Sequence, residues 1–489
     1  MSSWLRGRRG RLFVAALAVA GLGIGVVLWN AFYRERPAPY FESDEDHFLY
    51  GSIGTEAQNG VPYWIWLVLP RIFPEFLPGP GGYAALGLLS SGGHELPIGL
   101  SRVTIGVPRV SINCAFCHTT SVRTAPDAPR LLVAGGPSNQ TSTQGYLRFL
   151  FACASDPRFT ADVILAEIAR NHRLSALERL SYRLVIIPRT RKKLLEMKDQ
   201  YAWADRNPDW GPGRVDPFNP MKFGNLGQTM DATVGNSDTM PVWNAGGSEG
   251  RAYHWDGLNT SLQEVVLSSA LGDGTTTRWL DRDFARWNAT ESREMASLRR
   301  VQNYIGQRRP PKYPLAVDAG LAANGAAVYK AQCAECHDDG AKRAGAIIPI
   351  DEIGTDPSRL AMWTASAATA YNAYGQGHAW AFKAFRKTNG YVAVSLDGIW
   401  LRAPYLHNGS VPTLADLLEP PEARPKRFWR GFDLLDSVRV GFVSAGAEAE
   451  RSGTLFDTNL PGNSNAGHTY GTRLSPESKR ALMEYLKTR

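Results

Sequence analysis

Cysteine is scarce in this chain, with five residues among 489. Four of the five fall into two short clusters, "CAFCH" at 114–118 and "CAECH" at 333–337. A structural zinc site needs four ligands, commonly two Cys/His pairs that lie close together in the sequence. Neither cluster has a second pair near it. The scarcity of cysteine therefore argues against structural zinc at either place.

Other features are missing as well. No run of arginine or lysine alternates with aromatic residues, which argues against nucleic-acid binding. No fixed-period repeat appears, which argues against a solenoid. Hydrophobic residues make up 44% of the chain and charged residues 20%, values of a globular rather than a disordered protein. The formal net charge of +8 leaves an acidic redox partner or anionic lipid headgroups open as partners.

The two clusters share the pattern Cys-x-x-Cys-His. Thiols three residues apart can add to the two vinyl groups of haem, and the adjoining histidine then reaches the iron; this spacing is the signature of c-type haem attachment. A thioredoxin-like redox pair would not explain the histidine that follows in both copies. The sequence therefore predicts two covalently bound haem c groups. Their binding residues are Cys114, Cys117 and His118 for the first, and Cys333, Cys336 and His337 for the second.

The N-terminus carries four arginines and then an apolar stretch. Residues 12–33, "LFVAALAVAGLGIGVVLWNAFY", are apolar apart from Asn30. About 20 apolar residues are enough for a helix to cross a bilayer, and flanking arginines favour the cytoplasmic side. We therefore expect a transmembrane anchor in a bacterial inner membrane, with the body facing the periplasm. Haem attachment outside the bacterial cytoplasm agrees with this location.

Composition shifts along the chain suggest four parts. Residues 1–33 form the cytoplasmic tip and anchor, 34–95 a loop-rich lead-in, 96–312 a first haem c domain with a helical insertion, and 313–489 a second cytochrome c domain. Prolines at 310, 311 and 314 prevent a continuous helix at the main boundary. Apolar residues at three- and four-residue spacing predict helices over 155–203, and the simplest interpretation of the basic patch at 189–193 is a solvated helix face.

The last segment, "SPESKRALMEYLKT", predicts a helix with Ser475 as N-cap and Pro476 at its first position. The stretch before the second cluster predicts another helix, in which Gly325 and Tyr329 share one face. If these two helices cross at a small residue, they close a compact unit around a large flat ligand.

Three long stretches resemble one family. They are "AYHWDGLNTSLQEVVLSSALG" (252–272), "LDGIWLRAPYLHNGSVPTLADLLEP" (396–420) and "PGNSNAGHTYGTRLSPESKRALMEYLKT" (461–488). In this order around two haem motifs they are similar to the bacterial di-haem cytochrome c peroxidase superfamily, closest to the di-haem rubber oxygenase branch. The resemblance implies a mainly α fold, with two cytochrome c-like domains, loop-rich insertions and haems that face each other across the interface.

The resemblance also implies roles for single residues. Trp255 matches the tryptophan between the haems that relays electrons, and His468 matches the distal ligand of the second haem. His407 and Tyr405 match a motif near the second haem, where hydrogen bonds are expected; iron ligation by His407 stays open. The histidine that follows His118 in the sequence lies far on, within a basic helix, which favours an open first haem.

The function that these residues favour is a membrane-anchored di-haem oxidoreductase. The first haem would bind H2O2 or O2, and the second would pass on electrons from a donor protein or a small reductant. His254 and Glu264 are candidate acid–base groups for peroxide scission, although His254, like His94, also stays able to close the first haem. A non-catalytic electron-transfer cytochrome, with both irons six-coordinate, and a haem-based sensor are the alternatives.

Overall fold

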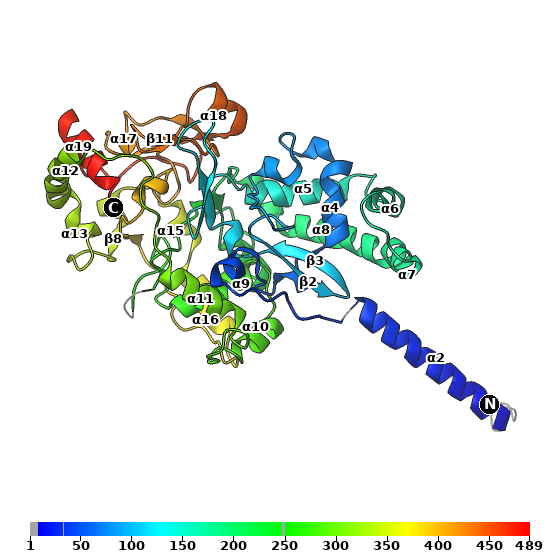
Figure 1. Cartoon of the computed structure of the whole chain (residues 1–489). Helices are drawn as coiled ribbons and strands as arrows, with labels where there is room; N and C mark the ends of the chain where they lie inside the picture. Colours follow the sequence, from blue (N-terminus) through cyan, green and yellow to red (C-terminus); the bar gives the residue numbers. More distant parts are fainter. Residues whose placement is uncertain (1–7, 33, 247–249) are drawn as a thin grey trace.

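The computed structural model describes residues 8–32, 34–246 and 250–489 (Figure 1). Helix α2 projects away from a mainly helical body in which short strands form small antiparallel sheets. The largest sheet in the described part of the chain has three strands in the order β1-β3-β2. Most of the polypeptide between the helices is loop, as the glycine- and proline-rich sequence predicts.

The helices are bounded as follows: α2 (Arg8–Phe32), α3 (Asp44–Tyr50), α4 (Tyr63–Ile72), α5 (Thr143–Ser155), α6 (Ala161–Ala169), α7 (Ala176–Ser181), α8 (Ile187–Gln200), α9 (Leu262–Gly272), α10 (Thr277–Phe284), α11 (Ser297–Gln307), α12 (Ala319–Gln332), α13 (Ala334–His337), α14 (Ile350–Ile353), α15 (Ser358–Met362), α16 (Ala365–Tyr374), α17 (Leu414–Leu417), α18 (Ala447–Ser452) and α19 (Pro476–Leu486). Two π-helical turns are η5 (Tyr182–Ile186) and η7 (Met221–Asn225).

The strands are β1 (Val61–Pro62), β2 (Leu100–Ile105), β3 (Val107–Ile112), β4 (Thr119–Val122), β5 (Leu131–Ala134), β6 (Arg214–Val215), β7 (Ser237–Asp238), β8 (Ile347–Pro349), β9 (Gly390–Val392), β10 (Arg427–Arg430), β11 (Leu435–Asp436), β12 (Gly441–Phe442) and β13 (Thr454–Asp457). The hairpin of β2 and β3 pairs Leu100 with Ile112 and Ile105 with Val107. This hairpin matters for the site because β3 leads directly into the first cysteine cluster.

The N-terminal segment forms helix α2 over nearly the residues that the sequence analysis assigned to a membrane anchor. Across the described residues, however, no helix combines the length and the apolar character that crossing a membrane requires. The predicted transmembrane anchor is therefore not supported.

The predicted helical insertion over 155–203 is confirmed, with interruptions. Thr160 caps α6 and Ser175 caps α7, each by accepting a hydrogen bond from a backbone amide in the first turn. The helix then passes through η5 into α8, which has a proline in its first turn. Helices α4 and α6 pack together, as do α5 and α8, around a core that includes Phe149, Leu150 and Ile164.

The two halves of the chain interlock. Helices α15 and α16 follow the predicted boundary near 312, but their side chains share a core with α9 and α11, which precede it. Tyr371 of α16 donates a hydrogen bond to the carbonyl of Ser268 in α9. The buried ammonium of Lys222 donates to Asn219, Asp231 and the carbonyl of Met362, which again joins the two sides. Folding of one half therefore depends on the other.

Helix α12 crosses the C-terminal helix α19 at a glycine. A Cβ atom on Gly325 would lie 1.9 Å from the carbonyl oxygen of Ala481, so only glycine allows this approach. Ser475 caps α19 as predicted, and Leu482 and Leu486 are buried beneath α12. The predicted crossing of first and last helix is confirmed, and it closes the unit that holds the second cluster.

Replacing Gly325 by alanine is expected to lower the free energy of unfolding by about 1–3 kcal/mol, because the added methyl group forces the two helices apart. The matched control is Gly320→Ala in the first turn of the same helix, where the new Cβ would meet only Asp318 Oδ1 at 3.5 Å. This control is expected to be neutral or to stabilise by up to about 1 kcal/mol. Thermal unfolding of the holoprotein measures both, and equal midpoints would contradict the close crossing.

Candidate functional site

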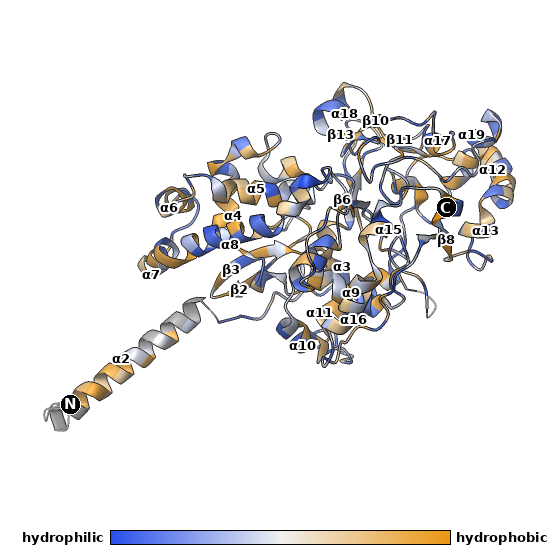
Figure 2. Ribbon diagram, turned by 180° about the vertical axis from the view of Figure 1, so that it is seen from behind, coloured by the Kyte–Doolittle hydropathy of each residue, from blue (hydrophilic) through white to orange (hydrophobic). Residues whose placement is uncertain are grey.

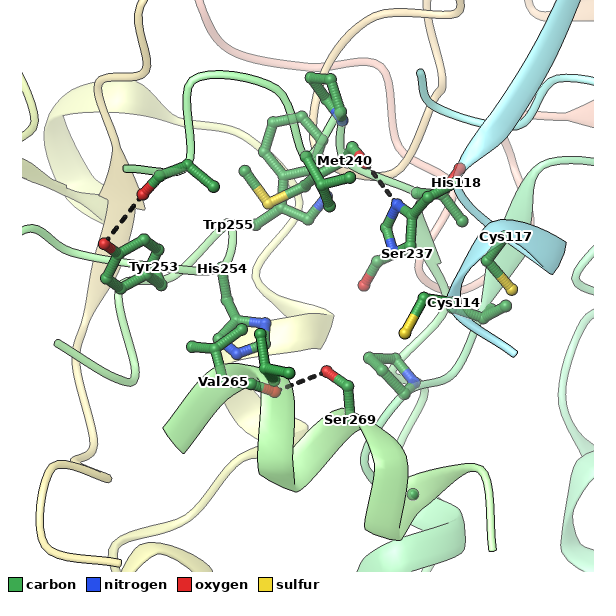
Figure 3. A pocket seen from close by; sticks show the side chains of 18 of the residues that line it. Cys114, Cys117, His118, Ser237, Met240, Tyr253, His254, Trp255, Val265 and Ser269 are labelled. Carbon is green, nitrogen blue, oxygen red and sulfur yellow. Dashed lines mark hydrogen bonds between the residues drawn. The ribbon is translucent and has the colours of Figure 1, made fainter. Parts of the chain in front are cut away.

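The first cysteine cluster lies on a rigid turn at the end of β3. Asn113 caps the 3-10 helix η4 (Cys114–Phe116) by accepting a hydrogen bond from the amide of Ala115 at 3.0 Å. Its side-chain amide donates to the carbonyl of Gly51 at 3.0 Å. The two hydrogen bonds fix the turn, so that both thiols line the same cavity, beside His118 (Figure 3).

The ring of His118 is oriented by a backbone carbonyl. Its Nδ1 atom lies 2.8 Å from the carbonyl oxygen of Met240. A carbonyl oxygen can only accept, so Nδ1 carries the proton and Nε2 keeps a free lone pair. Burial lowers the pKa of His118 to about 4, which keeps the ring neutral at pH 7. A neutral imidazole held in this tautomer is ready to bind a metal ion through Nε2.

The second cluster repeats the same arrangement. Helix α12 leads into it, Cys333 caps the helix end, and His337 closes the short helix α13. The Nδ1 atom of His337 lies 2.7 Å from the carbonyl oxygen of Val394, which again leaves Nε2 free. Burial also lowers the pKa of His337. Two unrelated stretches of chain thus present the same ligand in the same chemical state.

Both histidines line one cavity of about 1280 Å³. This is larger than the roughly 300–1,000 Å³ of typical small-molecule sites. Aromatic and aliphatic side chains contribute to its walls, among them Tyr146, Leu150, Met197, Phe218 and Trp243. The volume, the largely apolar walls, the thiols of Cys114 and Cys117 and the two histidines fit a large, flat, covalently attached ligand.

His468 faces His337 across the second site. Their ring centres are 6.4 Å apart, at an interplanar angle of 42°. Two imidazoles on opposite sides of one metal ion, each bonded at about 2.0 Å, have ring centres about 6 Å apart. The Nδ1 atom of His468 is buried without a hydrogen-bond partner, and its backbone has a φ of 44°, in the left-handed region. The spacing fits an iron ion held between the two rings.

Arg424 fixes the loop that carries His468. Its guanidinium is buried and donates to five backbone carbonyls, so all five of its N–H groups are used. Three of the acceptors lie in the loop, namely the carbonyls of Asn465 at 2.6 Å, Gly467 at 2.8 Å and His468 at 3.1 Å. The other two are the carbonyls of Glu419 and Leu417. Arg424 is therefore the positioning residue for this histidine.

Trp255 joins the two segments that orient the histidines. Its indole Nε1 donates to the carbonyl of Asp238 at 2.8 Å, two residues before the carbonyl that holds His118. Its own carbonyl accepts from the amide of Val392 at 2.8 Å, two residues before the carbonyl that holds His337. A continuous route of covalent and hydrogen bonds therefore runs from one histidine to the other through this tryptophan.

His254 lies next to Trp255 and lines the cavity. Figure 3 shows its ring beside Val265 and Ser269 of α9, across the space that His118 faces. Its Nε2 atom is buried without a partner, and its φ of 65° is unusual for a residue with a side chain. Burial, and then the charge of Arg359, lower its pKa to about 4. A buried, unpartnered nitrogen in a strained backbone is typical of a functional group.

The structure does not bring every predicted site residue to the cavity. The carboxylate of Glu264 does not line it; it accepts hydrogen bonds from the amides of Lys383 and Ala384 and from the side chain of Asn259. His407 is buried and stacks on Tyr391 at 3.9 Å, also outside the lining. His94 stacks on Tyr50 at 3.8 Å and does not line the cavity either.

Several cavity features escaped the sequence analysis. The carbonyls of Met240 and Val394 and the guanidinium of Arg424 act through tertiary contacts and carry no local sequence pattern. Asp273, at the C-terminal end of α9, lines the cavity near the first two thiols, and burial raises its pKa to about 7. A carboxyl group with this pKa can hold or release a proton at neutral pH.

Two family models match the part of the chain around the second cluster. One described as "Cytochrome C oxidase, cbb3-type, subunit III" matches residues 320–391, and one described as "RoxA-like, cytochrome c-like" matches residues 390–430. This region is cytochrome c-like. The match agrees with the Cys-x-x-Cys-His motif at 333–337, so this region is suited to carry covalently bound haem c for electron transfer or other redox chemistry.

Two proteins of Sinorhizobium fredii (strain NBRC 101917 / NGR234) are similar to this chain. The uncharacterized protein y4iJ is 27% identical over 478 residues, covering 78% of this chain and 76% of that protein. The uncharacterized protein y4iM is 33% identical over 233 residues, covering 39% of this chain and 53% of that protein. The names of these two proteins state no activity.

Replacing Arg424 by lysine is expected to release the loop that carries His468. Lysine has three donors on one atom and cannot reach five carbonyls. Loss of two such hydrogen bonds, at about 1 kcal/mol each, raises the open population of the loop about 30-fold. The haem held by His337 should therefore gain a high-spin fraction, measured by absorption and spin-resonance spectra of the oxidised protein.

Two controls separate positioning from a general loss of stability. Arg123→Lys changes an arginine that pairs with Asp433 at 2.8 Å, away from the loop, and is expected to leave the spectrum unchanged. His468→Ala is expected to make the same haem fully high-spin, and adding Arg424→Lys to it should change nothing further. An additional spectral change in the double variant would show that Arg424 acts by another route.

Proposed function

We propose that the cytochrome is a di-haem oxidoreductase, with one haem c on each Cys-x-x-Cys-His cluster, that reduces peroxide or activates O2 at the first haem. The observation that carries the proposal is the difference between the two sites. Opposite His337 a second imidazole lies at metal-bridging distance, with ring centres 6.4 Å apart. Among the described residues, no aromatic ring faces His118 in this way. The first haem thus keeps a face for a small oxidant.

The haems supply reversible electron transfer, and at an open face they bind small oxidants. The chain supplies the surroundings. His118 and His337 would hold the irons through Nε2, because Nδ1 is engaged by a carbonyl in each case. His254 offers an unpartnered ring nitrogen on the open side, where it can donate a hydrogen bond to a bound oxidant. Asp273 provides a carboxyl group with a pKa of about 7 that can supply protons.

His337 and His468 would hold the second haem from both sides, and a haem held in this way would supply a centre that receives and stores electrons. Trp255 would pass them on, since its hydrogen bonds join the segments that orient both proximal histidines. The reductant is an electron-donor protein or a small molecule. Because haem c is attached outside the cytoplasm in bacteria, we place the cytochrome in the periplasm. The closest functional analogy is the di-haem peroxidase and rubber oxygenase group that the sequence resembles.

The oxidised holoprotein is expected to show one high-spin and one low-spin haem, at two haems per chain, in absorption, spin-resonance and mass spectra. Turnover with H2O2 and a reduced donor then tests peroxidase activity, and O2 uptake tests oxygenase activity. Two low-spin haems in every redox state would contradict the proposal and favour a simple electron carrier. A single haem per chain would also contradict the proposal, because it requires one haem on each cluster.

His254→Phe keeps an aromatic ring but removes the ring nitrogen. It is expected to lower turnover of the oxidant by about 100-fold or more, as the loss of a positioned acid–base group does. The spin state of each haem should not change. His94→Phe, the same substitution outside the cavity, is expected to retain wild-type turnover. Unchanged turnover in His254→Phe would remove this residue from the mechanism.

Trp255→Phe is expected to slow electron transfer between the haems while leaving both spectra unchanged. Phenylalanine lacks the indole N–H, so the hydrogen bond to the carbonyl of Asp238 is lost. The rate can be followed after rapid reduction of the second haem. Trp363→Phe is the control, because Trp363 is buried outside the cavity lining and donates to Arg386 instead. Equal rates in both variants would exclude a route through Trp255.

A further inference from the structure

Three exposed leucines lie along the helical insertion. Leu177 and Leu180 of α7 are 58% and 53% exposed, and Leu184 of η5 is 63% exposed. Their spacing of three and four residues places them on one side of the helix. Figure 2 shows the hydrophobic α7 next to the strongly hydrophilic α8. A contiguous exposed apolar stripe on a folded helix marks an interaction site.

The helix cap and the buried side of the same helical run fix the outward orientation of the three leucines. Ser175 and Glu178 form a capping box that starts α7 firmly. On the opposite side of the same helical run, Tyr182 is 2% exposed and Ile186 is 6% exposed, both in the core formed with α6 and α8. The leucines therefore cannot turn inward without removing these two residues from the core.

Exposed basic side chains flank the three leucines in the sequence. Those of Arg173, Arg179, Arg183, Arg189 and Lys192 are exposed. Three acidic groups lie among them: Asp162 pairs with Arg183 at 2.6 Å, Glu196 pairs with Lys192 at 3.9 Å, and Glu178 accepts from Ser175. The region thus keeps an excess of positive charge around an apolar stripe. A basic amphipathic helix of this kind is typical of proteins that lie on an anionic membrane surface.

The stripe lies near the place where α2 joins the body. Glu35, just beyond α2, forms a β-bridge with Ile105 at the tip of the β2–β3 hairpin, and the amide of Arg36 donates to Thr104 at 2.8 Å. Leu100 and Val110 of the same hairpin share a buried core with Tyr182 of η5, so η5 packs into the same part of the molecule. Helix α2 also exposes apolar side chains, with Leu17 at 57% and Leu22 at 73%. In Figure 1 both features lie at one edge of the molecule.

We propose that Leu177, Leu180 and Leu184, with the exposed arginines around them, form a docking face, here called the α7 face, for an anionic phospholipid surface. The leucines would enter the boundary between headgroups and acyl chains, while the arginines contact lipid phosphates. A lipid surface satisfies both features at once, whereas an acidic protein would explain the arginines without the leucines. The inference is independent of the haem chemistry and concerns where the cytochrome works.

A fluorescent label at position 180 tests the α7 face in the full-length holoprotein. The natural thiols do not interfere, because four belong to the haem motifs and Cys153 is fully buried. Leu180→Cys carrying an environment-sensitive dye is expected to shift its emission to the blue with vesicles of phosphatidylcholine and phosphatidylglycerol, and less with phosphatidylcholine alone. High salt should reduce the shift, because it screens the arginines. Val438→Cys, at a site 78% exposed on the C-terminal half, is the control and should not shift.

Vesicle binding by unlabelled variants gives a second measurement. Serine at positions 177, 180 and 184 together is expected to weaken binding to the anionic vesicles by about tenfold or more. Arg173→Gln with Arg179→Gln should remove the preference for anionic lipid, and the haem spectra should stay those of the wild type. No shift at position 180, an equal shift at position 438, or unchanged binding by the serine variant would overturn the proposal. A shift with an acidic protein but not with vesicles would overturn it as well.

Discussion

The site depends on one interaction that occurs twice, a hydrogen bond from histidine Nδ1 to a backbone carbonyl. In His118 the acceptor is Met240, and in His337 it is Val394. The bond selects the tautomer, fixes the direction of the ring and leaves Nε2 free for iron. Because the acceptors lie more than fifty residues from the histidines along the chain, each site exists only when distant segments have folded onto the cysteine turns.

The same two carbonyl segments also link the sites. The indole of Trp255 donates to the carbonyl of Asp238, two residues before Met240. The carbonyl of Trp255 accepts from the amide of Val392, two residues before Val394. The segments that orient the proximal histidines therefore also hold this tryptophan. A displacement of either segment would therefore shift a proximal histidine and Trp255 at the same time. The two halves also share a buried core through α9, α15 and α16.

The surroundings of the two cysteine clusters differ on the side that faces each histidine. At the second site, Arg424 ties the His468 loop by donating to buried carbonyls, and such an arrangement favours a closed, invariant coordination sphere. At the first site, helix α9 and the strained residue His254 face the cavity, and no comparable clamp holds a ring opposite His118 in the described part of the chain. One rigid site and one accessible site are what electron storage and small-molecule chemistry respectively require.

The sequence alone determined the chemistry of the cofactor, because thioether attachment needs two thiols and a histidine at a fixed local spacing. It also indicated the caps and the glycine crossing of the last helix, which depend on neighbours in the chain or on a single missing side chain, as at Ser475 and Gly325. The assignment of a membrane anchor to residues 12–33 rested on hydropathy and on the flanking arginines, and the described residues do not support it.

Only the tertiary structure decided which polar residues reach the cavity. Glu264 and His254 are near neighbours in the sequence, yet one binds backbone amides outside the cavity while the other points into it. Arg424, Asp273 and the two carbonyl acceptors carried no sequence signal. Their roles come from contacts between segments far apart in the chain, and a local pattern contains no information about such contacts.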